Sequence, residues 1–437
     1  MHLSNRFFSL FGLLAALFAL SYPFPWLLAV SKGLFFAVWA LVLADVILLY
    51  RRRMPVTGLR TINHILSLSD PNPVQLTLEN QTGMVLSAAI YDELPVQLQQ
   101  RHFLWKCTLP ANASATHQYE VRPFTRGAYL FGHINVLLSS RLGLVQRRIR
   151  AGAPVEVQVY PSILQMKRYE LRAMQQIAHD TGIRRLRRIG HSYEFDQIKN
   201  YVEGDDYRSI NWKASGRRNT LMVNQYEDER SQQVYCIVDK SRAMKLPFGG
   251  LSLMDYAINA SLALSNIILK KKDKAGLLSF SDVMGSTLKA ERDTGQLQRI
   301  LEALYREKER PGESNYELLY EAVRRLVGGR SMLLLFTNFE SSYALERVLP
   351  ALRRLNAAHL LVVIFFENTE VKDITRQPVH QTSDIYRQVV ASQFIQEKKE
   401  MVSRLRQYGI QSVLTRPEDL TVNTINKYLE LKSRGLI

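Results

Sequence analysis

The sequence predicts a multidomain protein with a transmembrane helical hairpin, a small β-sandwich and a doubly wound α/β domain. A long apolar run opens the chain, short alternating segments follow it, and apolar strand patterns separated by helical patterns fill the second half. A chain of 437 residues is also too long for one ordinary core. We therefore assign residues 1–53 to the hairpin, 54–161 to the sandwich, 162–230 to a connector and 231–437 to the α/β domain.

The formal net charge of the chain is +17, and such an excess of basic residues needs a partner that tolerates it. Anionic lipid headgroups, nucleic acid and an acidic protein surface are the three candidates. The two cysteines, Cys107 and Cys236, are too few for a disulfide framework and have no second cysteine or histidine nearby at metal-ligand spacing. The composition therefore indicates a protein of a reducing compartment.

Residues 7–50 form an apolar run with only two formal charges. The run is too long for the apolar core of a signal peptide, and at about 20 residues per span it supplies two helices. Pro23 and Pro25 place the turn between them at residues 21–26, and a turn at residues 31–33 is the alternative. Either turn gives an even number of spans.

Basic residues flank this run, with Arg6 in front of it and Arg51, Arg52 and Arg53 directly behind it. By the positive-inside rule both ends face the cytoplasm, so the large soluble part is expected to be cytoplasmic. Asp45 lies about one turn from the end of the second helix, and we expect its carboxylate to reach the lipid headgroups.

The region 54–161 consists of short alternating segments with Pro, Gly and Asn between them. Short strands at this spacing indicate a small antiparallel sandwich of about 100 residues. No histidine, cysteine or acidic cluster here has catalytic or ligand spacing, so we interpret the region as a spacer or interaction module. The alternating patterns fall at residues 74–83, 85–91, 117–124, 126–148 and 155–160.

Residues 190–217 mix acidic, basic and large aromatic side chains more densely than a solvent-facing loop normally does. Gly204 and its acidic neighbours predict a tight turn, since glycine accepts a positive φ and aspartate side chains bond their own backbone. Arg208 and Trp212 follow this turn. An arginine that bridges the turn carboxylates, with the indole stacked on it, would hold the segment rigidly.

Two other functions are compatible with this part of the chain. Glu203, Asp205 and Asp206 are close enough in sequence to divide the roles of general acid and general base, which would make the chain a membrane-tethered hydrolase. A basic cluster upstream would suit a nucleic-acid-binding protein, although no recognisable motif of that class accompanies it. Structural ion pairs and a solvated connector are the simpler interpretations, so we predict no catalytic residues and no nucleic-acid partner. The basic cluster consists of Arg184, Arg185, Arg187 and Arg188.

Residues 231–437 alternate between apolar strand patterns and helical patterns, as in a doubly wound sheet. Ligands of such sheets bind at the loops that follow the carboxyl ends of the strands. The first strand ends in Asp239, Lys240 and Ser241, which places a carboxylate and a hydroxyl on one loop, as Mg²⁺ would require. The predicted strands are residues 234–238, 275–280, 331–336, 359–365 and 410–414, and helical patterns include residues 254–269 and 297–306.

Over nearly its full length the chain resembles a bacterial family known as domain of unknown function 58. The resemblance rests on the hairpin, on Arg-Gly-Ala-Tyr-Leu-Phe-Gly at residues 126–132, on Val-Tyr-Pro at residues 159–161, and above all on a signature of glycine, charged and aromatic residues. Lys199 stands where the family usually has an arginine. The signature falls on Gly190, Glu194, Phe195, Tyr201, Gly204, Asp205, Arg208, Ile210 and Trp212.

The last domain resembles a von Willebrand factor A domain, whose metal-ion-dependent adhesion site uses Asp-x-Ser-x-Ser, a threonine and a further aspartate. By this resemblance the metal positions are Asp239, Ser241, Ser314 and Asn338. Ala243 replaces the second serine, and the threonine and the last aspartate are replaced as well. One carboxylate then remains where a hard divalent cation favours two, so we expect a degenerate site and no certain cofactor.

The resemblance also implies a function, because proteins of this family are commonly encoded with a MoxR-type AAA+ ATPase and act with it in assembling or activating other complexes. We therefore expect a non-enzymatic adaptor at the bacterial inner membrane. Its expected partners are the lipids of that membrane, the ATPase and a client protein. The signature segment is expected to depend on Glu194, Asp205, Arg208 and Trp212.

Overall fold

The computed structural model describes residues 2–24, 26–100, 103–162, 165–167, 194–202, 205, 207–227, 231–375, 378 and 381–436. The chain divides into two compact units, Met1–Ser162 and Ile163–Ile437. Several predicted features lie outside the described residues, namely Gly190, Glu203, Gly204, Asp206 and the arginine cluster. The structure describes Glu194 and Phe195 by their backbone only.

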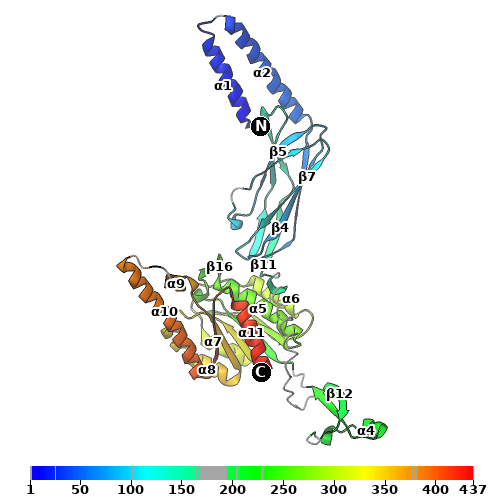
Figure 1. The fold of residues 1–437 in the computed structure, drawn as a ribbon, viewed down its shortest axis with the longest axis vertical. Coiled ribbons are helices and arrows are strands. Elements are labelled where there is room, and N and C mark those ends of the chain that lie inside the picture. The colour runs from blue at the N-terminus through cyan, green and yellow to red at the C-terminus, as the bar shows by residue number, and fades with distance from the viewer. Residues whose placement is uncertain are drawn as a thin grey trace. The chain divides into compact units, whose positions relative to one another are not determined.

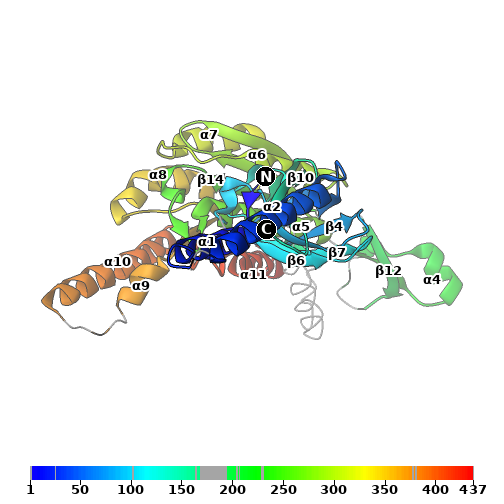
Figure 2. The same ribbon diagram turned by 90° about the horizontal axis from the view of Figure 1, so that it is seen from above.

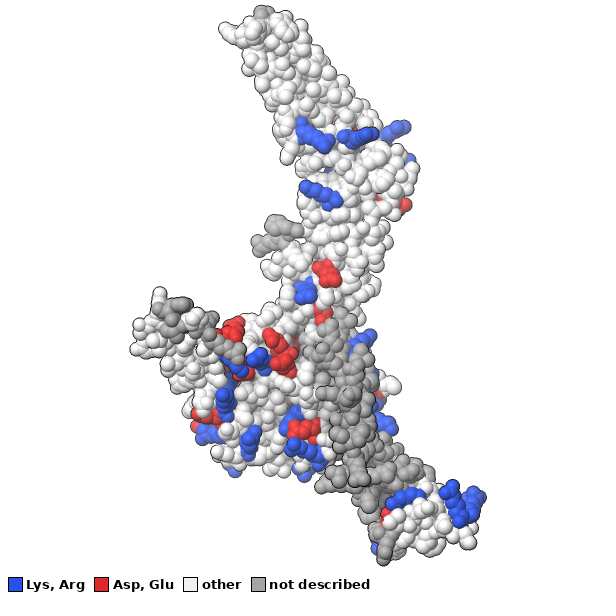
Figure 3. Space-filling view, in the orientation of Figure 1, with Lys and Arg blue, Asp and Glu red and all other residues white. Residues whose placement is uncertain are grey.

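The first unit begins with two apolar helices, α1 (Asn5–Leu20) and α2 (Trp26–Tyr50), which lie side by side (Figure 1). Phe11 of α1 packs edge-to-face on Phe35 of α2, with ring centroids 6.4 Å apart. Of the described helices, α2 is long and apolar enough to cross a membrane, whereas α1 is apolar but shorter. Because α2 continues through residues 31–33, a turn at that point is wrong. In Figure 3 the hairpin surface carries almost no charge, and basic side chains gather at its base.

Eleven strands described in the first unit form three sheets, with the orders β1-β10-β9-β5-β6, β2-β4-β7 and β3-β11-β8. The first two sheets pack face to face, because alternate residues of β4 such as Leu76 and Leu78 join Ile90 and Val136 in one core. The pairing of β3 with β11 is parallel, which departs from the predicted antiparallel sandwich in this one detail among the described pairings. The strands are β1 (His2–Leu3), β2 (Val56–Ile62), β3 (Ile65–Ser67), β4 (Asn72–Asn80), β5 (Leu86–Asp92), β6 (Trp105–Leu109), β7 (Ser114–Val121), β8 (Gly127–Phe131), β9 (Ile134–Ser139), β10 (Val145–Ala151) and β11 (Val155–Tyr160), with a short 3₁₀ turn at Val96–Leu98.

Asp45 of α2 fastens the helix to the β9–β10 loop. Its carboxylate is fully buried and accepts hydrogen bonds from the Ser140 hydroxyl and from the backbone N–H groups of Leu144 and Val145, the latter two at 2.9 Å. The expectation that Asp45 reaches lipid headgroups is therefore wrong. A buried carboxylate needs donors, and the folded loop supplies them.

The second unit contains a six-stranded sheet of order β18-β17-β14-β19-β20-β21, parallel except for the edge strand β18. Helices α5, α6 and α11 cover one face of the sheet, and α7, α8 and α10 cover the other (Figure 1). Each predicted strand is confirmed within one residue at both ends. The strands are β14 (Gln233–Asp239), β17 (Lys274–Phe280), β18 (Met284–Glu291), β19 (Met332–Phe336), β20 (Leu360–Phe366) and β21 (Gln411–Thr415). The helices are α5 (Leu253–Lys270), α6 (Gln296–Arg306), α7 (Tyr316–Leu326), α8 (Ser342–Ala358), α9 (Thr369–Ile374), α10 (Thr382–Gln407) and α11 (Leu420–Ser433).

Two further features of this unit stand apart from the sheet. The signature residues form an antiparallel pair, β12 (Glu194–Asn200) and β13 (Met222–Glu227), with the 3₁₀ turn Tyr207–Ser209 and the short helix α4 (Trp212–Arg218) between the strands. We call this segment, residues 194–227, the arm. In addition, α9 lies beside one end of α10, and this pair projects from the domain (Figures 1 and 2). A small hairpin, β15 (Pro247–Phe248) and β16 (Leu251–Ser252), precedes α5.

Candidate functional site

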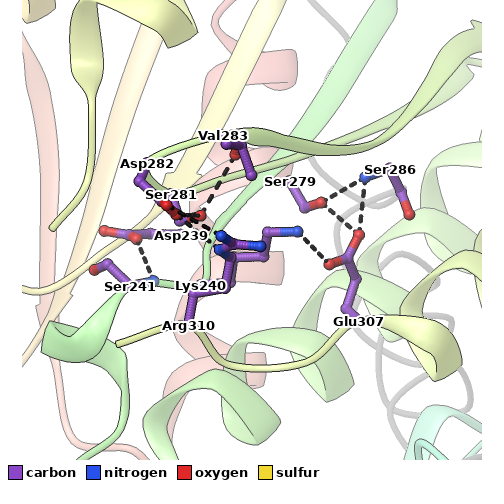
Figure 4. A network of polar contacts seen from close by, with 10 residues as sticks. All are labelled: Asp239, Lys240, Ser241, Ser279, Ser281, Asp282, Val283, Ser286, Glu307 and Arg310. Carbon is purple, nitrogen blue, oxygen red and sulfur yellow. Dashed lines mark hydrogen bonds and ion pairs between the residues drawn. The ribbon is translucent and has the colours of Figure 1, made fainter. Parts of the chain in front are cut away.

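The carboxyl ends of β14, β17 and β19 open into loops at one edge of the parallel sheet, as the sequence predicts. Asp239 ends β14, Ser281 and Asp282 follow β17, and Asn338 lies in the loop after β19. The loop that precedes α7 adds Ser314. Figure 4 shows the polar side chains that gather around the end of β14.

The side chain of Asp239 is buried and accepts hydrogen bonds on both carboxylate oxygens. Its Oδ1 accepts the backbone N–H of Ser241 at 2.9 Å, and the hydroxyl of Ser314 lies 2.7 Å from both oxygens. Thr337 donates its hydroxyl to Oδ2 at 2.8 Å and lies 2.7 Å from the Tyr316 hydroxyl. Burial raises the pKa of Asp239, and the hydrogen bonds only partly oppose this effect.

Asn338 uses both ends of its amide for contacts within the protein. Its Nδ2 donates to the backbone carbonyl of Ala243 at 3.2 Å, and its Oδ1 accepts from the ammonium of Lys398 at 3.1 Å. Lys398, on α10, also donates to the carbonyl of Phe339. Burial lowers the pKa of Lys398 to about 8, although two nearby glutamates act in the opposite direction.

These contacts decide whether Mg²⁺ suits the predicted site. The structure brings Asp239 and Ser314 together, but Asp239 already accepts three hydrogen bonds, and Asn338 lies against an ammonium group. In the described residues no group of three or more His, Cys, Asp or Glu side chains is placed to hold a metal ion. Because hard cations favour several free carboxylates, this donor set does not fit Mg²⁺. The predicted metal site stays an untested prediction.

A second buried carboxylate, Glu307, lies near the same edge of the sheet (Figure 4). Its Oε2 accepts from the ammonium of Lys240 at 2.9 Å, and its Oε1 accepts from the Ser279 hydroxyl at 2.5 Å and the Ser286 N–H at 2.9 Å. Burial alone would raise the pKa of Glu307, but these hydrogen bonds outweigh it, so the pKa lies below its ordinary value. A Cβ on Gly285 would lie 2.2 Å from both Lys240 Nζ and Ser279 Oγ. The contacts of these two side chains with Glu307 therefore require a glycine at position 285.

Sequence reasoning found Asp239, Ser241, Ser314 and Asn338 but missed three contributors to this edge. Thr337 directly precedes Asn338, so its position after a predicted strand was an available signal. No local sequence pattern could have identified Glu307 and Lys398, because they lie 67 and 60 residues from their partners Lys240 and Asn338.

In the arm, the turn is held by a lysine. The carboxylate of Asp205 accepts from the Lys199 ammonium at 2.8 Å and from the Val202 N–H at 3.1 Å. These hydrogen bonds lower the pKa of Asp205. Arg208 stacks on Tyr207, with its guanidinium 5.6 Å from the ring centroid.

The predicted stack of the indole on Arg208 stays a prediction, and Trp212 begins α4 with 72% of its surface exposed. Among the other signature residues, the Tyr201 N–H donates to the Leu221 carbonyl at 2.8 Å. Ile210 bridges to Val223 of β13. The backbone therefore holds the arm together and leaves the indole at the surface.

Residues 197–375 match the model of a family described as protein of unknown function DUF58. The match includes most of the arm and the loops around Asp239. The Bacillus subtilis (strain 168) protein YeaD, named as uncharacterized, is 25% identical over 166 residues. That alignment covers 38% of this chain and 39% of YeaD, so it spans about two fifths of the curated relative.

Two solved structures are similar to about a quarter of the chain each. The CARDB domain of the PF1109 protein from Pyrococcus furiosus is 14% identical, covers 24% of this chain and 91% of its own, and has a TM-score of 0.19. A β-glucosidase from Listeria innocua is 15% identical, covers 24% of this chain and 16% of its own, and has a TM-score of 0.15. At these scores neither similarity bears on the fold or function of this chain.

Proposed function

We propose that this chain is a membrane-anchored, non-enzymatic adaptor that works with a MoxR-type AAA+ ATPase to assemble or activate a client protein. In this proposal the α/β domain is von Willebrand factor A-like, α1 and α2 both span the bacterial inner membrane, and the soluble domains are cytoplasmic. The observation that carries the proposal is the exposed aromatic surface of the arm.

This surface has the composition of a protein-binding site. Tyr207, Trp212 and Val202 have exposed fractions of 68%, 72% and 62%. Exposed aromatic side chains beside arginines are typical of binding hot spots, because they supply large rigid contact areas. Helix α4 adds basic charge to the arm, which favours an acidic patch on the partner. Its basic residues are Lys213, Arg217 and Arg218.

An adaptor also needs a surface for its client, and α10 offers one. The inward face of the helix is buried through Ala391, Met401 and Leu405. The first half of the helix exposes several large apolar residues, and such exposed apolar surface normally marks an interaction site. These residues are Ile385, Tyr386, Val389, Val390 and Phe394.

Membrane anchoring by two spans is supported by the surface and the flanks of the hairpin. Both helices expose large apolar side chains, among them Leu13 on α1 and Phe36 on α2. In water such a surface is unfavourable, whereas in a bilayer it faces lipid tails. Arg6 and the three arginines after α2 lie at the same end of the hairpin, which favours a cytoplasmic orientation.

The test is affinity purification of the intact chain from membranes, read for an AAA+ ATPase. Trp212→Ala and Tyr207→Ala should each weaken binding of the ATPase by about thirtyfold and reduce its recovery accordingly, since hot-spot residues contribute about 2 kcal/mol or more. Both side chains are exposed, so the melting temperature should not change. Tyr343→Ala, which removes a tyrosine that is 77% exposed on α8, is the matched control and should retain the ATPase. No ATPase with the unaltered chain, or equal recovery with all variants, contradicts the proposal.

Asp205→Ala separates the adaptor from the hydrolase alternative. Loss of ATPase recovery with an intact fold is expected for the adaptor, because Asp205 holds the turn of the arm through Lys199. Unchanged recovery together with loss of a hydrolytic activity would favour the hydrolase.

A further inference from the structure

A cavity of about 450 Å³ lies between α7 and α8, near the amino ends of β19 and β20. The two helices lie side by side in Figure 1. Buried apolar side chains line part of the cavity, including Val323 and Val327 from the α7 side and Leu355 of α8. Its volume lies within the ordinary range of small-molecule sites. The cavity is separate from the loops around Asp239, which follow the carboxyl ends of the strands.

His359 lines this cavity and carries a buried polar atom without a described partner. The residue is 7% exposed, and its Nδ1 is buried without a hydrogen-bond partner among the described residues. Its backbone N–H is occupied, since it donates to the Leu355 carbonyl at 2.9 Å. Buried polar atoms in folded proteins nearly always have a partner. Burial lowers the pKa of His359, so the ring is neutral near pH 7 and offers one N–H donor.

Two arginines, Arg324 and Arg330, also line the cavity. Neither guanidinium forms a hydrogen bond, ion pair or ring contact within the described part of the chain. The neighbouring Arg354 differs, because it pairs with Glu317 and stacks on Tyr320 with its guanidinium 4.6 Å from the ring centroid. Arg324 and Arg330 are exposed at the cavity without a described protein partner, whereas the guanidinium of Arg354 beside them is paired.

We propose that this cavity binds a carboxylate that carries a short aliphatic group. The two guanidinium forks match the planar geometry of a carboxylate, and His359 Nδ1 supplies a further donor. The aliphatic group packs on Val323, Val327 and Leu355. A free branched-chain acid and the C-terminal carboxylate of a polypeptide that ends in leucine share this chemistry. This proposal concerns a ligand-binding site, and it does not depend on the proposed adaptor function.

The test uses the full chain in lipid nanodiscs, with calorimetry and saturation-transfer NMR corrected by empty nanodiscs. The probes are 4-methylpentanoate for the free acid and acetyl-Ala-Ala-Leu for the peptide terminus, each beside its uncharged amide. We expect saturable binding of at least one acid and binding of its amide that is about tenfold weaker or absent, because the charge-assisted bonds are lost. The acid that binds more tightly identifies the source of the ligand.

Variants connect this binding to the cavity. The double variant Arg324→Gln/Arg330→Gln should weaken binding of the acid by about tenfold or more. Arg325→Gln changes a residue of α7 that does not line the cavity, so it should leave binding of the acid unchanged. His359→Leu should weaken binding and His359→Asn should restore part of it, because the asparagine amide replaces the Nδ1 donor. The proposal is overturned if neither acid binds, if amides bind as tightly as acids, or if Arg325→Gln has the same effect as the double variant.

Discussion

Asp239 and Glu307 are two buried carboxylates of the same domain, and each accepts hydrogen bonds from serine hydroxyls and a backbone N–H. Glu307 also accepts from the ammonium of Lys240, and its pKa lies below the ordinary value. Asp239 is more deeply buried, its described donors are all neutral, and its pKa lies above the ordinary value. Neutral donors therefore do not offset the rise in pKa that complete burial causes at Asp239. The less deeply buried Glu307, which also has an ammonium partner, stays ionised.

The largest effect should come from breaking the charged pair. Lys240→Met leaves Glu307 buried and without its cation, and removal of one partner of a buried pair costs about 3–5 kcal/mol of stability. Denaturant unfolding of the variant measures this loss. The double variant Lys240→Met/Glu307→Gln should recover part of it, because no unpaired charge remains. Equal instability of the single and the double variant would show that the loss comes from packing alone.

Asp45 extends the comparison to a third buried carboxylate, whose described donors are also neutral. Asp45→Leu leaves the N–H groups of Leu144 and Val145 buried without an acceptor, which should cost about 2–3 kcal/mol. Protease resistance of the sandwich in nanodiscs measures the change. Asp45→Asn keeps one acceptor oxygen and is the matched control. A leucine variant as resistant as the asparagine variant would contradict this role of the carboxylate.

The pH dependence of stability should have opposite signs at the first two sites. The pKa of Glu307 is lowered on folding, so its contribution is present above the unfolded value of 4.5 and is lost as the pH falls. The pKa of Asp239 is raised on folding, so stability falls as the pH rises from 3.8 through the folded value. Relative to the unaltered chain, Asp239→Asn should therefore gain stability as the pH rises from 3.8 through the folded pKa of Asp239, whereas Glu307→Gln should lose stability as the pH rises from the folded pKa of Glu307 to 4.5. Urea unfolding at each pH measures the free energy of unfolding. If this free energy depends on pH in the same way for both variants and the unaltered chain, the opposite pKa shifts are contradicted.

The smallest effect concerns metal. Because Asp239 and Asn338 are already occupied by protein contacts, millimolar Mg²⁺ or Mn²⁺ should change the melting temperature by less than about 1 °C. Asp239→Ala should respond in the same way as the unaltered chain. A clear rise in melting temperature that disappears in Asp239→Ala would instead establish the predicted metal site.

Much of the second unit was predictable because its parallel strands are buried on both faces and therefore appear as continuous apolar runs. The edge strand β18 (Met284–Glu291) was missed, since none of its residues is fully buried and its sequence therefore has no continuous apolar run. The arm was predicted as a loop held by an arginine. Its strands became visible only through the long-range pairing of β12 with β13.

At the candidate site, sequence position identified residues at strand ends but not their partners. Asp239 and Ser241 follow directly from the end of a predicted strand. Lys398 holds Asn338 from α10, and no local pattern distinguishes it from other lysines of that helix. Asp45 was misjudged for the same reason, because the groups that satisfy it belong to a loop formed much later in the chain.

This separation in sequence has a consequence for synthesis. The donors to Asp45 follow it by 95 to 100 residues, so α2 leaves the ribosome before they exist. Until then the carboxylate needs water, so in the proposed membrane anchor this end of α2 would stay at the aqueous boundary. Folding of the sandwich then replaces that water with Ser140, Leu144 and Val145. Under the proposed function, Asp45 would link the depth of the anchor to completion of the sandwich.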